Sequence, residues 1–209
     1  MTIWHVVVVN EDAAEELRAL SADLRGKFER IVALIEAKGL EQVHEPYLKH
    51  LEGKLWEMRM IGRDNIARSI YVTATGRRVV VLHTFIKKQD KTPRRALEIA
   101  RQDEGGQMKR RMIPARELFA EWRRDPNYLR EYNAMAEEFE LAGALIDARG
   151  KAKLTQADVA ARMMTSQQAI ARLESGRGNP SVGTLRRFAK VTGTKLRIVF
   201  EPVKRRSAR

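Results

Sequence analysis

The sequence predicts an α+β protein. Helices packed on a small antiparallel sheet make up the first half, and an all-α domain with a short C-terminal strand makes up the second. β-Branched and aromatic runs are concentrated before residue 90, whereas helical periodicity dominates after residue 115. The 209 residues are 44% apolar, enough for two domains of about 100 residues each. The polar, glycine-containing stretch 103–111 has no periodicity. We therefore expect domains at 1–102 and 112–209, joined by a linker at 103–111.

The first half begins with a β-branched run, Ile3 to Val9, which predicts a buried strand. Apolar residues then recur at spacings of three and four from Ala13 to Lys38, which indicates one helix or two helices hinged near Gly26. Three β-rich runs predict strands, and Thr75 with Gly76 predicts a hairpin between the last two. These runs are Leu55 to Met60, Ile66 to Ala74 and Arg78 to Ile86. Thr92 and Pro93 are typical of a helix start, so a short helix should run to Gln102.

The second half is predicted to be helical almost throughout. Ala115 to Arg124 and Tyr128 to Arg149 have helical periodicity, interrupted at Asp125 and Pro126. Two short helices within 154–180 and another from Val182 to Val191 should follow. Lys195 to Glu201 alternates apolar residues with charged or smaller ones, which predicts a final strand.

Composition narrows the class of partner. The formal net charge of +13 favours a polyanion, and without a long apolar segment we expect nucleic acid and no membrane. The chain has no cysteine and only four histidines, so we expect no disulfide, no metal site and no cofactor. The N-terminus lacks a basic leader and a small-residue cleavage site, which leads us to expect a cytosolic protein.

The stretch from Leu154 to Pro180 has the outline of a helix-turn-helix: a helix, a turn and a second helix beginning at Gln167. A recognition helix must present short polar side chains near its N-terminus to base edges. Glutamine can bond bidentately to adenine, and arginine to guanine or phosphate. Serine and glutamine here could instead merely cap the helix. The candidate DNA contacts are Gln156, Thr165, Ser166, Gln167, Gln168, Arg172 and Arg177.

These residues resemble the phage-repressor-like, Xre-type helix-turn-helix family, whose pattern LTQxxLAxxxGxSQxxIxxxExGxxxPS is matched almost throughout. Met164 departs from it, because the family usually carries glycine between the helices. A left-handed residue other than glycine costs on the order of 1 kcal/mol, so we expect a slightly altered turn. The resemblance implies sequence-specific DNA binding by a homodimer formed through this domain.

Basic residues crowd the predicted sheet and its exit, either as solvated surface or as an RNA-binding face. The strings EGKLWEMR (52–59), IARSIYVTATGRRVVVLHTFIKK (66–88) and DKTPRRALEIA (90–100) are similar to the HigB-type branch of the RelE/ParE toxin superfamily. The chain from about residue 112 resembles the HigA-type antitoxins. The resemblance implies a RelE-like, ribosome-dependent mRNA endonuclease that needs no metal, and an antitoxin that neutralises this toxin and represses its own operon. Because tethering raises the effective antitoxin concentration to about millimolar, we expect the endonuclease to be inhibited in the full chain.

Metal-free RNA cleavage requires stabilisation of the phosphorane and two proton transfers. Arg68 matches the family's strand arginine, and Lys87 and Lys88 match its basic strand end. Tyr71 could stack or transfer a proton, but it differs in strand parity from Arg68 and could equally be a core residue. His83 competes with a packed core histidine, and Arg59 could simply pair with Glu57. Lys49, Lys54 and Lys91 are candidate RNA contacts.

Two alternatives stay open. The chain could be a non-enzymatic regulator whose RelE-like domain serves dimerisation or sensing. It could also carry a ParE-like toxin that inhibits gyrase, because the superfamily includes such members. In either toxin case we expect contact between toxin and antitoxin, within or between chains, and Ala115 to Tyr132 is the segment expected to make it.

Overall fold

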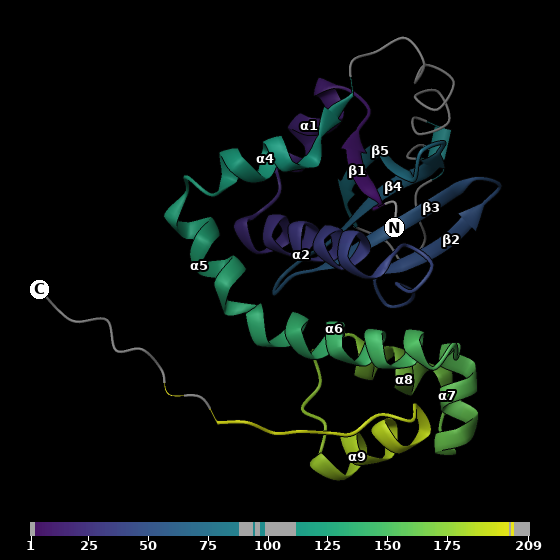
Figure 1. Cartoon of the computed structure of the whole chain (residues 1–209). Helices are drawn as coiled ribbons and strands as arrows, with labels where there is room; N and C mark the ends of the chain where they lie inside the picture. Colours follow the sequence, from purple (N-terminus) through teal and green to yellow (C-terminus); the bar gives the residue numbers. More distant parts are fainter. Residues whose placement is uncertain (1–2, 88–93, 95–96, 99–111, 201, 203–209) are drawn as a thin grey trace, which may run out of the picture.

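The structure is a computed structural model that describes residues 3–87, 94, 97–98, 112–200 and 202. We call residues 3–98 the N-terminal region and residues 112–202 the C-terminal region. The fold is α+β: a six-stranded sheet with helices, followed by the helices of the C-terminal region (Figure 1). No helix among the described residues is long and apolar enough to span a membrane.

Two helices follow the first strand. Helix α1 (Glu11–Arg18) begins at Asn10, whose side chain accepts from the backbone N–H of Ala13 at 2.9 Å. Helix α2 (Ala22–Lys38) starts after a short break, so the two-helix alternative is confirmed, but the break does not lie at Gly26. Gly26 lies inside α2, where a Cβ would come within 2.5 Å of Met135 Cε. This glycine provides room for the C-terminal region and is not a hinge.

The sheet is mixed and contains more strands than expected. Its order is β2-β3-β4-β5-β1-β6. The strands are β1 (His5–Val8), β2 (Leu48–Glu52), β3 (Leu55–Ile61), β4 (Ile66–Ala74), β5 (Arg78–Ile86) and β6 (Ile113–Pro114). The neighbouring pairs are antiparallel except that β1 runs parallel to β5, with Val7 opposite Val80. The expectation of an antiparallel sheet therefore holds for every pair but this one, because β1 enters the sheet between β5 and β6.

The C-terminal region contributes β6 and six helices. The helices are α4 (Ala115–Trp122), α5 (Pro126–Ala134), α6 (Ala136–Lys151), α7 (Gln156–Met163), α8 (Gln167–Glu174) and α9 (Val182–Val191). Asp125 caps α5 by accepting from the backbone of Asn127, which explains the predicted interruption there. The predicted strand at 195–201 is wrong for its described residues, because 195–200 are extended without a strand partner. Residues 94 and 97–98 are helical; the rest of the helix expected at 92–102 and the linker at 103–111 lie outside the described residues.

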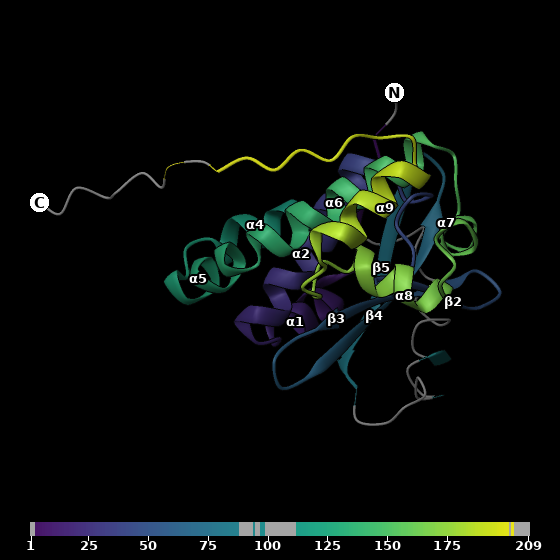
Figure 2. The ribbon, with the colours of Figure 1, turned by 90° about the horizontal axis from the view of Figure 1, so that it is seen from below.

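One hydrophobic core joins the two regions. Leu24 and Phe28 of α2 share it with Trp122 of α4 and Tyr128 of α5, and these side chains are at most 1% exposed. Phe28 meets Trp122 edge to face at 6.3 Å between ring centroids. Helix α2 thus lies between the sheet and the helices α4 to α6 (Figures 1 and 2). A second, smaller core lies within the helix-turn-helix, around Val159, Ile170 and Phe188.

Candidate nucleic-acid interfaces

The helix-turn-helix is built from locally specified ends. Thr155 and Asp158 form a capping box at the start of α7, with the Thr155 N–H donating to Asp158 Oδ2 at 2.8 Å. That backbone hydrogen bond lowers the pKa of Asp158. Met164 ends α7 in the left-handed conformation, with φ 53° and ψ 53°, at the position where the family pattern has glycine. Ser166 then caps α8 by accepting from the N–H of Ala169 at 3.1 Å.

Helix α8 presents an exposed polar strip. Gln167, Gln168 and Arg172 are exposed along it, and Thr165 and Ser166 are exposed in the turn before it. Arg177 is exposed in the loop that follows. The structure therefore brings six of the seven candidate DNA contacts onto one helix and its flanks.

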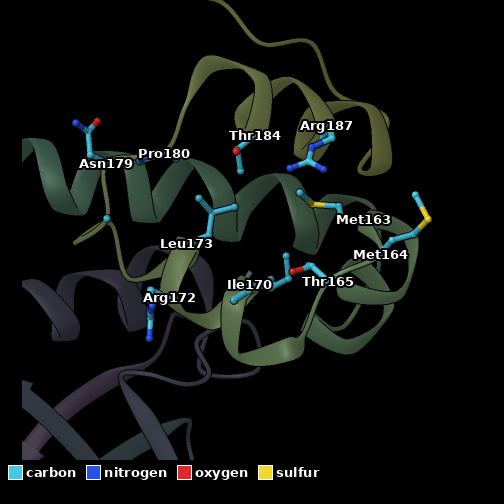
Figure 3. A pocket seen from close by; sticks show the side chains of 12 residues that line it. Met163, Met164, Thr165, Ile170, Arg172, Leu173, Asn179, Pro180, Thr184 and Arg187 are labelled. Carbon is cyan, nitrogen blue, oxygen red and sulfur yellow. The ribbon is translucent and has the colours of Figure 1, made fainter.

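One side of the strip borders a pocket between the α7–α8 turn and α9. Thr165 and Leu173 line it from the α8 side, and Thr184 and Arg187 from α9, as Figure 3 shows. Met164, 94% exposed, stands at its edge. Arg187 and Asn179 were not among the predicted contacts. The basic pair Arg186–Arg187 on a short amphipathic helix was the signal that could have suggested the first of them.

Gln156 is placed differently from the other candidates. Its side chain is buried, and its Nε2 donates to Glu45 O at 2.8 Å and to Glu174 Oε2 at 2.9 Å. Glu174 also pairs with Arg149 at 2.6 Å, both side chains being 1% exposed. Arg149 Nη2 in turn donates to Gln42 O at 2.7 Å. This buried polar network holds the C-terminal end of α8 and leaves Gln156 no surface for a phosphate contact.

The N-terminal region forms a wall on the other side of the α8 strip. Glu45, Pro46 and Ile61 line a groove together with Gln168, Arg172 and Arg177. Nearby, the Tyr47 hydroxyl donates to Ser175 O at 2.8 Å. The strip is therefore bounded by α9 on one side and by the N-terminal region on the other.

The second candidate site lies on the sheet. Strand pairing places Lys49, Glu57, Ile70 and His83 in one row across β2 to β5, because directly opposed residues share a face. The next row contains Arg59, Arg68 and Phe85. Four of the predicted toxin residues, Lys49, Arg59, Arg68 and His83, consequently lie on one face of the sheet. These residues are up to 34 positions apart in the sequence, and the strand register alone brings them to one face.

A buried carboxylate organises this face. Glu57 is 0% exposed; Arg68 Nη1 lies 2.9 Å from its Oε2, and Arg59 Nε pairs with its Oε1. Arg68 is itself 7% exposed. His83 is partly buried, and its Nδ1 lies 2.7 Å from Glu16 Oε1 of α1. Each of the two arginines and the histidine therefore contacts a carboxylate.

Tyr71 lies on the opposite face from Arg68. It is paired with Trp56, stacks on that ring at 6.5 Å and is 1% exposed. Burial raises the pKa of its hydroxyl. The β4–β5 register shifts between Ile70 and Tyr71, but the β3–β4 register is regular there, so Tyr71 still faces away from Arg68. Tyr71 is a core residue by position.

The remaining toxin candidates lie at the margins. Lys49 and Lys54 are exposed, and Lys87 is partly buried with its backbone N–H donating to Ile66 O at 2.7 Å. Lys88 and Lys91 lie outside the described residues. Among the residues that the structure describes, no three His, Asp or Glu side chains are placed to hold a metal ion.

Charged pairs connect the two regions around α2. In five pairs the N-terminal region supplies the cation: Arg18–Glu121, Arg25–Asp125, Lys27–Glu138, Lys38–Asp147 and Arg63–Glu131. Glu29, 3% exposed, reverses the pattern by accepting from Arg123 and from the Tyr128 hydroxyl. Pro114 pairs with Val7 as β6 extends the sheet. The contact thus includes most of Ala115 to Tyr132, the segment expected to make it.

The fold and these surfaces define a class of protein: an α+β domain joined to a DNA-binding helix-turn-helix domain. Residues 15–103 match the family described as phage derived protein Gp49-like, and residues 145–199 match the helix-turn-helix family. Antitoxin HigA1 of Mycobacterium tuberculosis, in strains CDC 1551 / Oshkosh and ATCC 25618 / H37Rv, is 32% identical over 77 residues. The match covers 37% of this chain and 52% of the relative, so the chain spans about half the length of the curated relatives it matches.

Proposed function

We propose that the chain is a toxin–antitoxin module in one polypeptide. The N-terminal region is a HigB-type endoribonuclease of the RelE/ParE superfamily that cleaves mRNA on the ribosome. The C-terminal region is a HigA-like antitoxin that neutralises the nuclease and represses the operon by binding operator DNA. The similarity to a HigA1 antitoxin supports the second assignment, and the Gp49-like match with the basic sheet face supports the first.

The observation that carries this proposal is the way the C-terminal region enters the N-terminal fold. Strand β6 extends the sheet beside β1, and α4 to α6 cover α2 with a shared apolar core. The buried Glu29 is satisfied by two side chains of the C-terminal region. An antitoxin attached in this way holds its toxin at an effective concentration of about millimolar, so the intact chain should be silent.

The proposed chemistry uses the face around Arg68. Arg68 and Arg59 would stabilise the phosphorane charge, while His83 or Lys87 would take part in proton transfer. Tyr71 has no part in this scheme because of its position on the other face. In the DNA-binding part, Gln167, Gln168 and Arg172 would contact base edges, and Thr165, Ser166 and Arg177 the phosphates.

Growth assays test the toxin assignment. Residues 1–102, induced alone, should arrest growth with loss of mRNA, and residues 112–209 supplied in trans should restore growth. Arg68→Ala should relieve the arrest, whereas Arg77→Asn, a change in the exposed β4–β5 turn that tolerates its φ of 54°, should not. A soluble, folded fragment without effect on growth would contradict the proposal. DNA-damage signalling without mRNA loss would identify a gyrase inhibitor instead.

A second candidate, a non-enzymatic regulator, is favoured by one observation. Arg59 and Arg68 both pair with the buried Glu57, an arrangement that also suits a purely structural cluster. This candidate predicts a growth-neutral N-terminal fragment, while the full chain still retards its own promoter DNA in gel-shift assays. The two outcomes of the growth assay therefore separate the two candidates.

A further inference from the structure

The pocket between the α7–α8 turn, α8 and α9 has no role in the proposed nuclease, and the polar strip of α8 only borders it. We call it the α8–α9 pocket, and Figure 3 shows it from close by. Its cavity volume is about 470 Å³, within the range of about 300–1,000 Å³ that is usual for small-molecule sites. A cavity of this size accommodates a compact organic molecule.

The floor of the α8–α9 pocket is apolar. Ile170 and Leu173 line it from α8, and Met163 lines it from the end of α7. Met163 and Ile170 are 6% and 1% exposed, because both belong to the small core of the helix-turn-helix. Pro180 adds a rigid apolar wall in the loop before α9. A preformed apolar floor favours a ligand with an apolar body.

The polar side chains of the pocket can all donate hydrogen bonds, and no carboxylate of the described residues lines it. Arg187 reaches from α9 towards the space between the two helices, and Arg172 lies at the α8 rim. Within the described part of the chain, neither arginine pairs with a carboxylate. Thr165 and Thr184 contribute hydroxyl groups from the two sides of the cavity. This set fits an anionic head group, because a guanidinium binds a carboxylate through two parallel hydrogen bonds.

Met164 supports a ligand-binding role for this pocket. It has φ 53° and ψ 53°, a left-handed conformation that costs a residue other than glycine on the order of 1 kcal/mol. Its side chain is 94% exposed at the edge of the pocket, so packing in the core does not offset this cost. Methionine is flexible and polarisable, and it is common at surfaces that adapt to a bound apolar group. A bound ligand gives this exposed side chain a contact that the fold alone does not.

We propose that the α8–α9 pocket binds an amphipathic organic anion, with its apolar body on Ile170 and Leu173 and its anionic head at Arg187. Thr165 also belongs to the exposed strip of α8, so the bound anion lies at the edge of the surface proposed to contact DNA. Because a duplex brings phosphates to that edge, ligand and DNA exclude each other through charge and space. Each therefore weakens the binding of the other by the same factor. The competition rests on the proposed function, whereas the binding site does not.

Anilinonaphthalene sulfonate, a fluorescent aromatic anion, tests the site in the intact chain without nucleic acid. We expect one equivalent to bind, with affinity at least tenfold lower in Arg187→Gln and at least threefold lower in Met164→Gly. Arg186→Gln, at the neighbouring exposed position of α9, should leave the affinity unchanged. Since Met164→Gly relieves a left-handed residue, weaker binding by that variant does not come from unfolding. The uncharged N-phenylnaphthylamine should bind at least tenfold more weakly, and decanoate should displace the sulfonate.

Methionine methyl resonances locate the bound sulfonate. The methyl groups of Met163 and Met164 should shift on its addition, whereas those of Met58 and Met60, buried in the sheet, should not. Equal affinity in the wild type and Arg187→Gln, equal affinity for the uncharged analogue, or unshifted Met163 and Met164 would overturn the inference. Sulfonate binding that leaves retardation of the promoter DNA unchanged would overturn the competition alone. A chain that binds the sulfonate but no promoter DNA would overturn the proposed DNA-binding function and leave the site standing.

Discussion

Tyr128→Phe removes one hydroxyl group from the contact between the two regions and should lower the free energy of unfolding by about 2 kcal/mol. Tyr128 is 0% exposed and donates to Glu29 Oε2, while Arg123 pairs with the other carboxylate oxygen. Burial, reinforced by the hydrogen bond to Glu29, raises the pKa of Tyr128, so the hydroxyl stays protonated and remains a donor. Without it, a buried charged acceptor loses a hydrogen bond of a kind worth about 1.5–3 kcal/mol.

Thermal and denaturant unfolding of the intact chain measure this loss. For a chain of this size, 2 kcal/mol corresponds to a decrease in Tm of about 4–8 °C. Glu29→Gln removes the charge, and in that background Tyr128→Phe should be about 1 kcal/mol less damaging. Tyr132→Phe is the matched control on the same helix, because its hydroxyl donates to no described residue. It should change the free energy of unfolding by less than about 0.5 kcal/mol.

A Tyr128→Phe variant that loses no more stability than Tyr132→Phe, or that loses as much in the Glu29→Gln background, would contradict this role of the hydroxyl. The magnitude also bears on neutralisation. A loss of 2 kcal/mol weakens an interaction about thirtyfold. Because tethering supplies an effective concentration of about millimolar, this single change should leave the proposed toxin silent in the intact chain. Growth arrest by full-length Tyr128→Phe would contradict that estimate.

Three further changes test other parts of the structure. Arg149→Met leaves the buried Glu174 carboxylate without its cation and should lower the free energy of unfolding by about 3–5 kcal/mol. The exposed Arg162→Met should not. Recovery in Arg149→Met/Glu174→Leu would show that the uncompensated charge is the cause. Met164→Gly should raise stability by about 0.5–1 kcal/mol because it relieves a left-handed residue, and Ala161→Gly inside α7 should lower it by about 1 kcal/mol. The Thr155 hydrogen bond lowers the pKa of Asp158 below its value in the unfolded chain. The stabilisation that the ionised Asp158 gives the fold is therefore present above about pH 4 and is lost as the pH falls further. Asp158→Asn should reduce the dependence of the free energy of unfolding on acid pH.

The elements with strong local signals could be predicted from the sequence. Strands β3 to β5 lie within a residue or two of their predicted ranges, because their β-branched or aromatic residues are bounded by turn residues. Helices α7 and α8 were equally clear, since their caps at Thr155 and Ser166 are encoded locally. Strand β2 (LKHLE) lacks this composition and was missed.

Elements that depend on distant partners could not be predicted. Strand β6 has two residues and exists only because β1 provides an edge for it. The parallel pairing of β1 with β5 is a choice of topology that periodicity does not encode. Gly26 resembled a hinge in the sequence, yet its role depends on Met135, more than a hundred positions away. The strand expected at 195–201 had the right alternation but no partner within the described residues of one copy.

The site shows the same division. Strand parity correctly separated Tyr71 from Arg68, and it placed Arg59 on the face of Glu57, because alternation is a local property. The pairing of His83 with Glu16, by contrast, depends on how α1 packs. Gln156 matched the pattern of a phosphate contact, but the N-terminal region supplies Glu45 O as its partner. The catalytic and DNA-binding roles themselves stay predictions.

The buried network around Glu174 connects the two functions proposed for the chain. Glu174 belongs to α8, the helix that presents the polar strip proposed to bind DNA. Its partners Arg149 and Gln156 also donate to Gln42 O and Glu45 O of the N-terminal region. Undocking the N-terminal region would remove both backbone acceptors from side chains that hold α8. If operator DNA binds more tightly when the N-terminal region is docked, then DNA binding must stabilise docking by the same free energy, because linkage between two equilibria is reciprocal. The N-terminal region would then be part of the structural support of α8 as well as the proposed target of neutralisation.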